Sequence, residues 1–180
     1  MAQFNQMQEI KRRFFALRNG IVADTIRKGG LGYKMVFGLN LPQIMEIAEG
    51  LTPSAGLASE LWADKRTRES MLLAPMVYPR EAMTCEKASE WLGEVPTTEV
   101  ADILCHRLLR HLPFAWDVAM CHIDSPVALQ RYAAFRLLFN VVSRYPSEIK
   151  PFAEAEYAAS EPLTRSLCHA ILEEIEFLLG

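Results

Sequence analysis

The sequence is poor in the features that mark several large protein classes. Its 180 residues include only 4 cysteines, far fewer than a disulfide-stabilised scaffold of this length would carry. It has no uncharged apolar run of roughly 18 residues, which a membrane-spanning helix needs. Its first residues contain no apolar stretch of the signal-peptide type. We therefore expect a cytoplasmic protein with reduced thiols and no membrane partner.

The short motifs of common enzyme classes are also missing. The chain has no GxGxxG, no P-loop, no HExxH, no GxSxG and no CxxC. Because nucleotide-dependent and zinc-protease chemistry depend on these patterns, both are disfavoured, and we expect neither a nucleotide nor another cofactor.

Three cysteines are each followed directly by a histidine. Adjacent residues on a helix point about 100° apart, so no such pair chelates a metal as a unit. We expect buried cysteines beside half-exposed histidines, and no metal; convergence of the three pairs on one zinc ion is the weaker alternative. The pairs are Cys105-His106, Cys121-His122 and Cys168-His169.

The chain also lacks the excess of positive charge that is typical of nucleic-acid-binding domains, since its formal net charge is −3. The charge is unevenly distributed, however. Residues 1–34 carry seven basic and two acidic residues, a net of +5, whereas residues 145–180 carry a net of −5. This distribution leaves DNA binding open for the first and middle parts of the chain and disfavours it at the C-terminal end.

Apolar residues make up 51% of the chain and recur at helical spacing nearly everywhere, while no alternating run pairs into a sheet. The pattern predicts an all-α fold of nine or ten helices. From residue 54 onward the helices fall into pairs every 35–45 residues, as in a HEAT-type repeat array. We predict one domain over residues 1–180, with a basic helix over 1–32 and helix pairs over 41–180; a globular bundle is the alternative.

Three of the expected helices have definite start or stop signals. Ile10, Phe14, Leu17 and Ile21 form one apolar stripe, which predicts a single helix ended by the glycines at 29–32. Start signals at residues 96–98 and 124–126 predict two further helices, over 99–112 and through about residue 143.

Asp102 is a candidate site residue on the predicted 99–112 helix. It lies off the apolar stripe, which consists of Val100, Leu104, Leu108 and Leu112. His106 follows at i+4 and could share a hydrogen bond with the carboxylate. The pair either points into a groove or is an ordinary solvated pair on the helix surface.

Several arginines could form a phosphate-binding patch. Arg107 and Arg110 follow Asp102 on the same predicted helix, and Arg131 and Arg136 lie on the helix that follows residue 126. The alternative is that they are exposed arginines with scattered glutamate partners.

The order and spacing of short segments over residues 33–170 are similar to those of the AlkD-like DNA alkylation repair family, whose members are built of HEAT-like repeats. The first similar segment has an aromatic residue followed by Phe-Gly-Leu and a proline. The second has Leu and Trp, followed by Arg-Glu at the start of an apolar helix. The third ends in the family's active-site aspartate, and the fourth is a Leu-Gln-Arg-x-Ala-Ala helix. They lie at residues 33–42, 57–62, 68–74, 97–102 and 129–134.

The resemblance implies a right-handed HEAT/ARM-like solenoid of antiparallel helix pairs and a monofunctional glycosylase that excises cationic alkylated purines from duplex DNA. It gives Asp102 the role of the carboxylate that stabilises the developing sugar cation. It gives Arg131 a phosphate contact, to which Arg107 and Arg110 would add. His106, Thr98 and His169 would be neighbours of the site. The alternative function is a non-catalytic HEAT-repeat module that binds a DNA structure or a protein partner.

Overall fold

The computed structural model describes residues 2–180, and side chains from residue 6 onward. Over that part of the chain the regular structure is entirely helical, and the one bridge of strand type joins Met35 to Thr67. The all-α prediction is therefore confirmed. Within the same residues, every helix is too short or too polar to cross a membrane.

The chain divides into two compact units, one ending at Ala82 and the other running from Met83 to Gly180. The prediction of a single domain over 1–180 stays a prediction. Each unit has its own helices and its own buried core.

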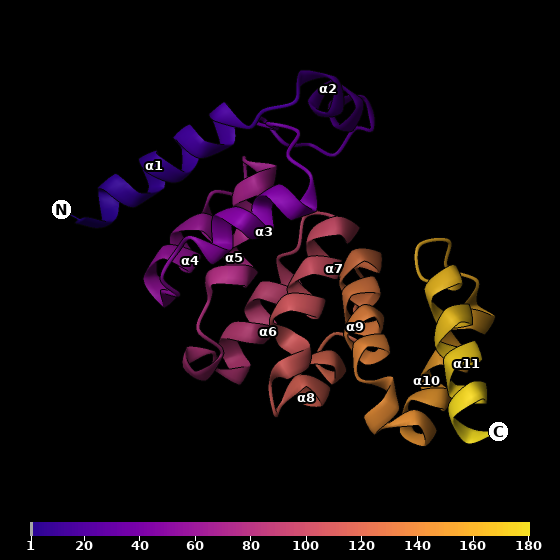
Figure 1. Ribbon diagram of the computed structural model, residues 1–180. Coiled ribbons are helices and arrows are strands. Elements are labelled where there is room, and N and C mark those ends of the chain that lie inside the picture. Colours follow the sequence, from indigo (N-terminus) through magenta and orange to yellow (C-terminus); the bar gives the residue numbers. More distant parts are fainter. Residues whose placement is uncertain (1) are drawn as a thin grey trace. The chain divides into compact units, whose positions relative to one another are not determined.

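Unit 1 is organised around α5, which is buried along nearly its whole length. Helices α3 and α4 pack against α5, and α1 packs against α4. Pro75 lies inside α5 without ending it at that point. The helices of this unit are α1 (Ala2–Ala16), α2 (Gly20–Lys28), α3 (Leu41–Glu49), α4 (Ala55–Ala63), α5 (Arg68–Val77) and the short 3-10 turn η1 (Arg80–Ala82) (Figure 1).

The prediction of one continuous helix through Ile21 is wrong. The helix ends at Ala16, and Asn19 starts α2 by accepting a hydrogen bond from the backbone N–H of Val22. The backbone N–H of Asn19 in turn donates to the carbonyl of Phe37 at 2.8 Å. This N-cap breaks the apolar stripe, and Ile21 is consequently 84% exposed.

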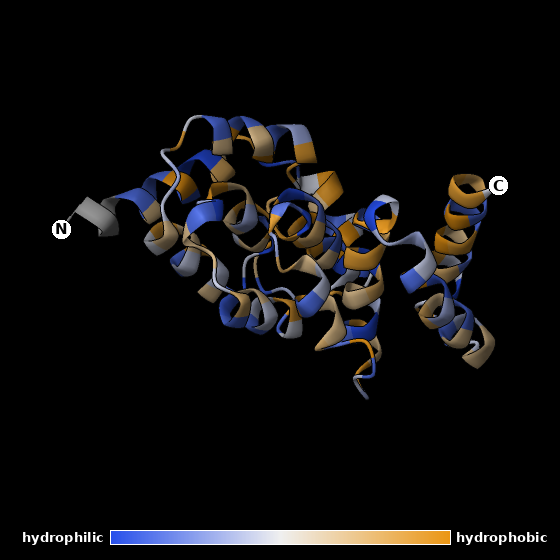
Figure 2. Ribbon diagram, turned by 90° about the horizontal axis from the view of Figure 1, so that it is seen from below, coloured by the Kyte–Doolittle hydropathy of each residue, from blue (hydrophilic) through white to orange (hydrophobic). Residues whose placement is uncertain are grey.

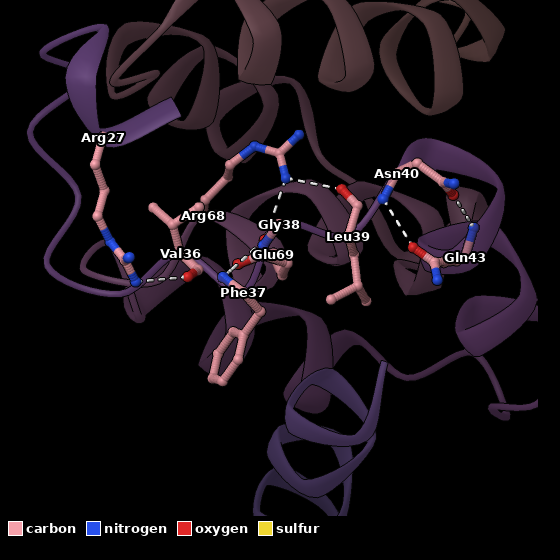
Figure 3. A network of polar contacts seen from close by, with 9 residues as sticks. All are labelled: Arg27, Val36, Phe37, Gly38, Leu39, Asn40, Gln43, Arg68 and Glu69. Carbon is pink, nitrogen blue, oxygen red and sulfur yellow. Dashed lines mark hydrogen bonds and ion pairs between the residues drawn. The ribbon is translucent and has the colours of Figure 1, made fainter. Parts of the chain in front are cut away.

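The loop over residues 33–40 is held by a carboxylate in the core of unit 1. Glu69 has no exposed surface, and it accepts hydrogen bonds from the backbone N–H groups of Phe37 (3.1 Å) and Gly38 (2.9 Å). Arg68 pairs with the same carboxylate at 3.2 Å and donates to the carbonyl of Leu39 at 3.0 Å (Figure 3). The N–H groups of Phe37 and Gly38 and the carbonyl of Leu39 are therefore satisfied by side chains of α5.

Unit 2 consists of packed helix pairs. Helix α7 packs on α9, α8 on α9 and α6 on α8, while α10 and α11 form the last pair and α11 contacts α9. Figure 2 shows an apolar C-terminal end on α11, where Phe177, Leu178 and Leu179 are exposed. The helices are α6 (Cys85–Gly93), α7 (Thr98–Arg107), η2 (Leu109–His111), α8 (Ala115–Met120), α9 (Ala128–Asn140), η3 (Val142–Arg144), α10 (Pro146–Ala159) and α11 (Arg165–Leu179).

Two predicted helices of this unit are shorter than expected. The 99–112 prediction becomes α7 followed by the turn η2, because Pro113 pushes Leu112 into an extended conformation (ψ 144°) and the chain tightens before it. The other helix starts at Ala128 and ends at Asn140, after which the β-branched Val141 and Val142 are buried at a 3-10 turn. In both cases the start or stop signal is right in kind and displaced by a few residues.

Candidate nucleic-acid interface

Helix α7 presents the predicted apolar stripe to the core of unit 2. Val100, Leu104 and Leu108 have no exposed surface, and Leu112 is 3% exposed. Thr97 caps the helix, since its hydroxyl accepts a hydrogen bond from the backbone N–H of Val100 at 3.3 Å. The cap and the stripe together fix which face of α7 remains outside.

Asp102 lies on that outer face and is held by two side chains of α9. Arg136 donates from Nε to Oδ1 at 2.6 Å and from Nη2 to Oδ2 at 3.3 Å. The hydroxyl of Tyr132 donates to Oδ1 at 2.9 Å and itself accepts from Arg136 Nη2 at 3.0 Å. The carboxylate is 39% exposed, so it is accessible from outside although both of its oxygens are engaged.

The guanidinium of Arg136 is fixed from several sides. Its Cζ lies 5.7 Å from the ring centroid of Tyr132 and 5.8 Å from that of Phe139, within the range of cation–π attraction. Burial acts to lower the pKa of Arg136, but the hydrogen bond that Arg136 donates to Tyr132 and the charge of Asp102 outweigh it, so the pKa is raised. Arg136 therefore remains a cation at this surface.

A group of cations surrounds the exposed His106, one turn after Asp102. Partial burial and the charges of Arg110, Arg107 and Arg136 lower the pKa of His106. The Nε of Arg110 donates to His111 at 3.3 Å, and an exposed arginine of η3 donates to the backbone carbonyl of Arg110 at 3.1 Å. We call this set the α7–α9 basic surface; its residues are His106, Arg107, Arg110, His111, Arg136 and Arg144.

Arg131 lies on α9 but is engaged elsewhere. Its Nε pairs with Glu156 of α10 at 3.1 Å, and its Nη2 pairs with Glu161 at 3.1 Å. Its Nη1 donates to the carbonyl of Ser125 at 2.6 Å, and the side chain is 18% exposed. In the structure Arg131 thus joins α9 to the α10–α11 pair, and its role at a phosphate stays a prediction.

The predicted neighbours of the site lie in different places. His106 follows Asp102 on α7, and Thr98 is the first residue of that helix. His169 is on α11, where its ring lies 5.9 Å from that of Tyr157 and its Nδ1 is 3.3 Å from Glu173. The proximity of His169 to Asp102 stays a prediction.

The Cys-His pairs do not gather into a ligand set. Cys105 and Cys168 are buried, Cys121 is exposed, and His122 bonds to Ser89 at 2.8 Å. Within residues 2–180 no three His, Cys, Asp or Glu side chains are placed to hold a metal ion.

The sequence does not predict Tyr132, which lies beside this surface, or His111 and Arg144, which belong to it. The sequence gives Tyr132 no functional signal, although its i, i+4 spacing from Arg136 places both side chains on one face of α9. Arg144 gave no signal in the sequence, because its contact with Arg110 spans 34 positions.

No protein-family model and no curated protein sequence matches the chain. A solved structure does match it, one described as "a new family of proteins related to the HEAT-like repeat DNA glycosylases with affinity for branched DNA structures". The superposition has a TM-score of 0.79 over 92% of this chain and 73% of that chain, at 19% sequence identity.

The chain has the HEAT-like repeat fold. The similarity of its short segments to the AlkD-like family is thereby confirmed at the level of the fold, and the globular bundle that the helical pattern left open is set aside. Because the two sequences are only 19% identical, the similarity establishes the fold alone. The activity of this chain depends on which residues its own surface presents.

Proposed function

We propose that this HEAT-like repeat protein binds DNA through the α7–α9 basic surface. The observation that carries the proposal is the gathering of Arg107, Arg110 and Arg136 around His106, one turn after Asp102. His111 and Arg144 extend this group through their contacts with Arg110. Arginines that converge on one face are the usual contacts to phosphate oxygens. A net charge of −3 for the whole chain does not oppose this, because phosphate binding responds to the local field.

The solved structure with the same fold supports the choice of DNA as the partner. That protein is described as having affinity for branched DNA structures. A branched or kinked duplex brings phosphates of more than one arm close together, which suits a compact cluster of cations. We therefore expect tighter binding to a branched junction than to a linear duplex of the same length.

Salt titration of DNA binding tests the proposal. The variants Arg110→Gln and Arg144→Gln are each expected to weaken binding to all sequences alike and to reduce the slope of log K against log salt by about one phosphate contact. Arg165→Gln is the matched control, since Arg165 is an exposed arginine at the start of α11, outside the basic surface. Equal effects of all three variants, or no binding of any DNA at low salt, would refute the proposal and favour a protein partner.

A second candidate function is excision of an alkylated purine by Asp102. It is favoured by the half-exposed carboxylate in the middle of a basic surface. A carboxylate in that role stabilises the cationic sugar by its negative charge. Because Arg136 is paired with Asp102, excision requires this ion pair to open when DNA binds, and the geometry therefore supports binding better than excision.

Release of methylated purines from alkylated duplex DNA separates the two functions. An excising protein releases 7-methylguanine or 3-methyladenine, and Asp102→Asn abolishes the release while duplex binding remains. Release by the wild type at the level of the Asp102→Asn variant would exclude catalysis and leave the binding function in place.

A further inference from the structure

We propose that unit 1 carries a second nucleic-acid site, a pocket that takes one unpaired nucleotide by stacking its base and pairing its phosphate. This inference rests on the proposed DNA-binding function and concerns a different part of the chain. The pocket lies between the end of α1, the start of α2 and the loop that follows α2, and has a volume of about 250 Å³. That is below the roughly 300–1,000 Å³ of sites for drug-sized ligands, and suits one planar base.

An exposed aromatic ring forms one wall of the pocket. Phe15 is 57% exposed at the end of α1, in contrast to Phe14, which has no exposed surface. The guanidinium carbon of Arg18 lies over the Phe15 ring, 3.9 Å from its centroid, and Nη1 of Arg18 donates to the carbonyl of Phe15 at 2.9 Å. Aromatic rings and arginine planes are the surfaces on which unpaired bases stack.

A second wall of the pocket is apolar and anchored to the core. Phe37 and Val36 line the pocket from the loop after α2. The ring of Phe37 lies 5.7 Å from that of the buried Phe14, and its backbone N–H is held by Glu69 at 3.1 Å. This wall is therefore preformed, so that little ordering is required when a base enters.

Positive charge at the rim gives the site its preference for an anionic ligand. Arg18, Arg27 and Lys34 all line the pocket. Arg27 is fixed by Asp24 at 2.9 Å and by the carbonyl of Val36 at 3.0 Å. Within residues 2–180, neither Arg18, which is held at Phe15, nor Lys34 pairs with a carboxylate, so no carboxylate neutralises either charge.

An apolar slot with a cationic rim matches a nucleotide in its two parts, the base in the slot and the phosphate at the rim. Branched DNA exposes unpaired nucleotides at or near its junction, as does a single-stranded gap. The pocket would thus supply a contact to unpaired DNA that the α7–α9 basic surface, which has no exposed aromatic slot among its residues, does not offer.

Binding of a fluorescent thymidine oligonucleotide to the full chain tests the site. Phe15→Ala is expected to weaken binding about 5- to 150-fold, the effect of losing one stacked base. Phe15→Trp is expected to restore it. Phe177→Ala is the matched control, because Phe177 is 82% exposed on α11, and it should leave the affinity unchanged.

The rim charge is tested by a second pair of variants. Lys34→Gln should reduce the salt dependence of oligonucleotide binding by somewhat less than one phosphate, about 0.7 in slope. Lys28→Gln, which removes an exposed lysine that does not line the pocket, should have little effect. Thermal unfolding of each variant checks that the fold is intact.

The source of the nucleotide is distinguished by comparing free thymidine monophosphate with the oligonucleotide and with a blunt duplex. We expect Phe15→Ala to weaken binding of the oligonucleotide and of branched DNA, but not of blunt duplex. If only the monophosphate competes for the pocket, the pocket is a free-nucleotide site. If the wild type binds duplex DNA, and Phe15→Ala binds the oligonucleotide as tightly as Phe177→Ala does, the pocket proposal is refuted and the proposed function stands. Binding to phosphatidylserine vesicles and to none of the nucleic acids overturns both.

Discussion

The buried carboxylate of Glu69 gives a sharp prediction for the stability of unit 1. Replacement by glutamine keeps the size of the side chain but removes its charge. One carboxylate oxygen becomes an NH2 group, which cannot accept from the backbone N–H groups of Phe37 and Gly38 that lie 2.9–3.1 Å away. The change also removes the buried ion pair between Glu69 and the guanidinium of Arg68, which is 6% exposed.

The expected loss follows from these contacts. Removing one partner of a buried ion pair costs about 3–5 kcal/mol, because the remaining charge stays buried without compensation. Each hydrogen bond to a charged group contributes about 1.5–3 kcal/mol. Part of this contribution is already included in the loss of the ion pair. We therefore expect Glu69→Gln to lower the free energy of unfolding by about 3–5 kcal/mol.

Urea unfolding followed by far-ultraviolet circular dichroism measures this loss. Since the chain has two compact units, amide hydrogen exchange of Phe37 and Gly38 is measured alongside, so that the effect is assigned to unit 1. Glu60→Gln is the control, because Glu60 is an exposed glutamate on α4, and it should change stability by no more than about 0.5 kcal/mol. A loss below about 1 kcal/mol in Glu69→Gln, with unchanged exchange at both amides, would refute the role given to this carboxylate.

Three further predictions follow from single residues. Gly38→Ala should destabilise the fold by several kcal/mol in the same unfolding assay, because φ is +79° and an added Cβ would collide with the carbonyl of Asn19, whereas Gly20→Ala has free space and should be neutral or stabilising. Burial lowers the pKa of His122, so the folded state favours its neutral ring. The contribution of this ring to the free energy of unfolding should be fully present above about pH 6.5 and should fall as the pH drops below that value. The urea midpoint measures this decline, and His122→Asn should flatten it. DNA affinity should rise as the pH falls, because a bound phosphate raises the lowered pKa of His106. In fluorescence anisotropy His106→Gln should remove this dependence, and an unchanged pH profile would contradict the placement of His106 at the interface.

Local patterns determined much of the helical structure. The caps at Ser54 and Thr84 and the start signal at Thr97 lie where α4, α6 and α7 begin, since a capping side chain acts on N–H groups only two or three residues away. The stripe on α7 was predicted for the same reason, because helical periodicity fixes which residues share a face.

The N-terminal region shows where local patterns were insufficient. Ile10 and Phe14 are buried as expected, whereas Leu17 and Ile21 are exposed. The stripe is interrupted because Asn19 exchanges its helical hydrogen bonds for a contact with Phe37, a residue 18 positions later. No pattern within one helix contains that information.

The same distinction applies to the candidate site. The sequence determined that Asp102 lies off the core-facing stripe of its helix and that arginines are frequent on the two helices concerned, because both facts depend on spacing alone. Only the tertiary packing of α7 on α9 decided that Asp102 pairs with Arg136 and that Arg131 turns instead to Glu156. Charged side chains choose their partners by distance and desolvation across helices that are about 25–35 positions apart in the chain, so these pairings are a property of the fold.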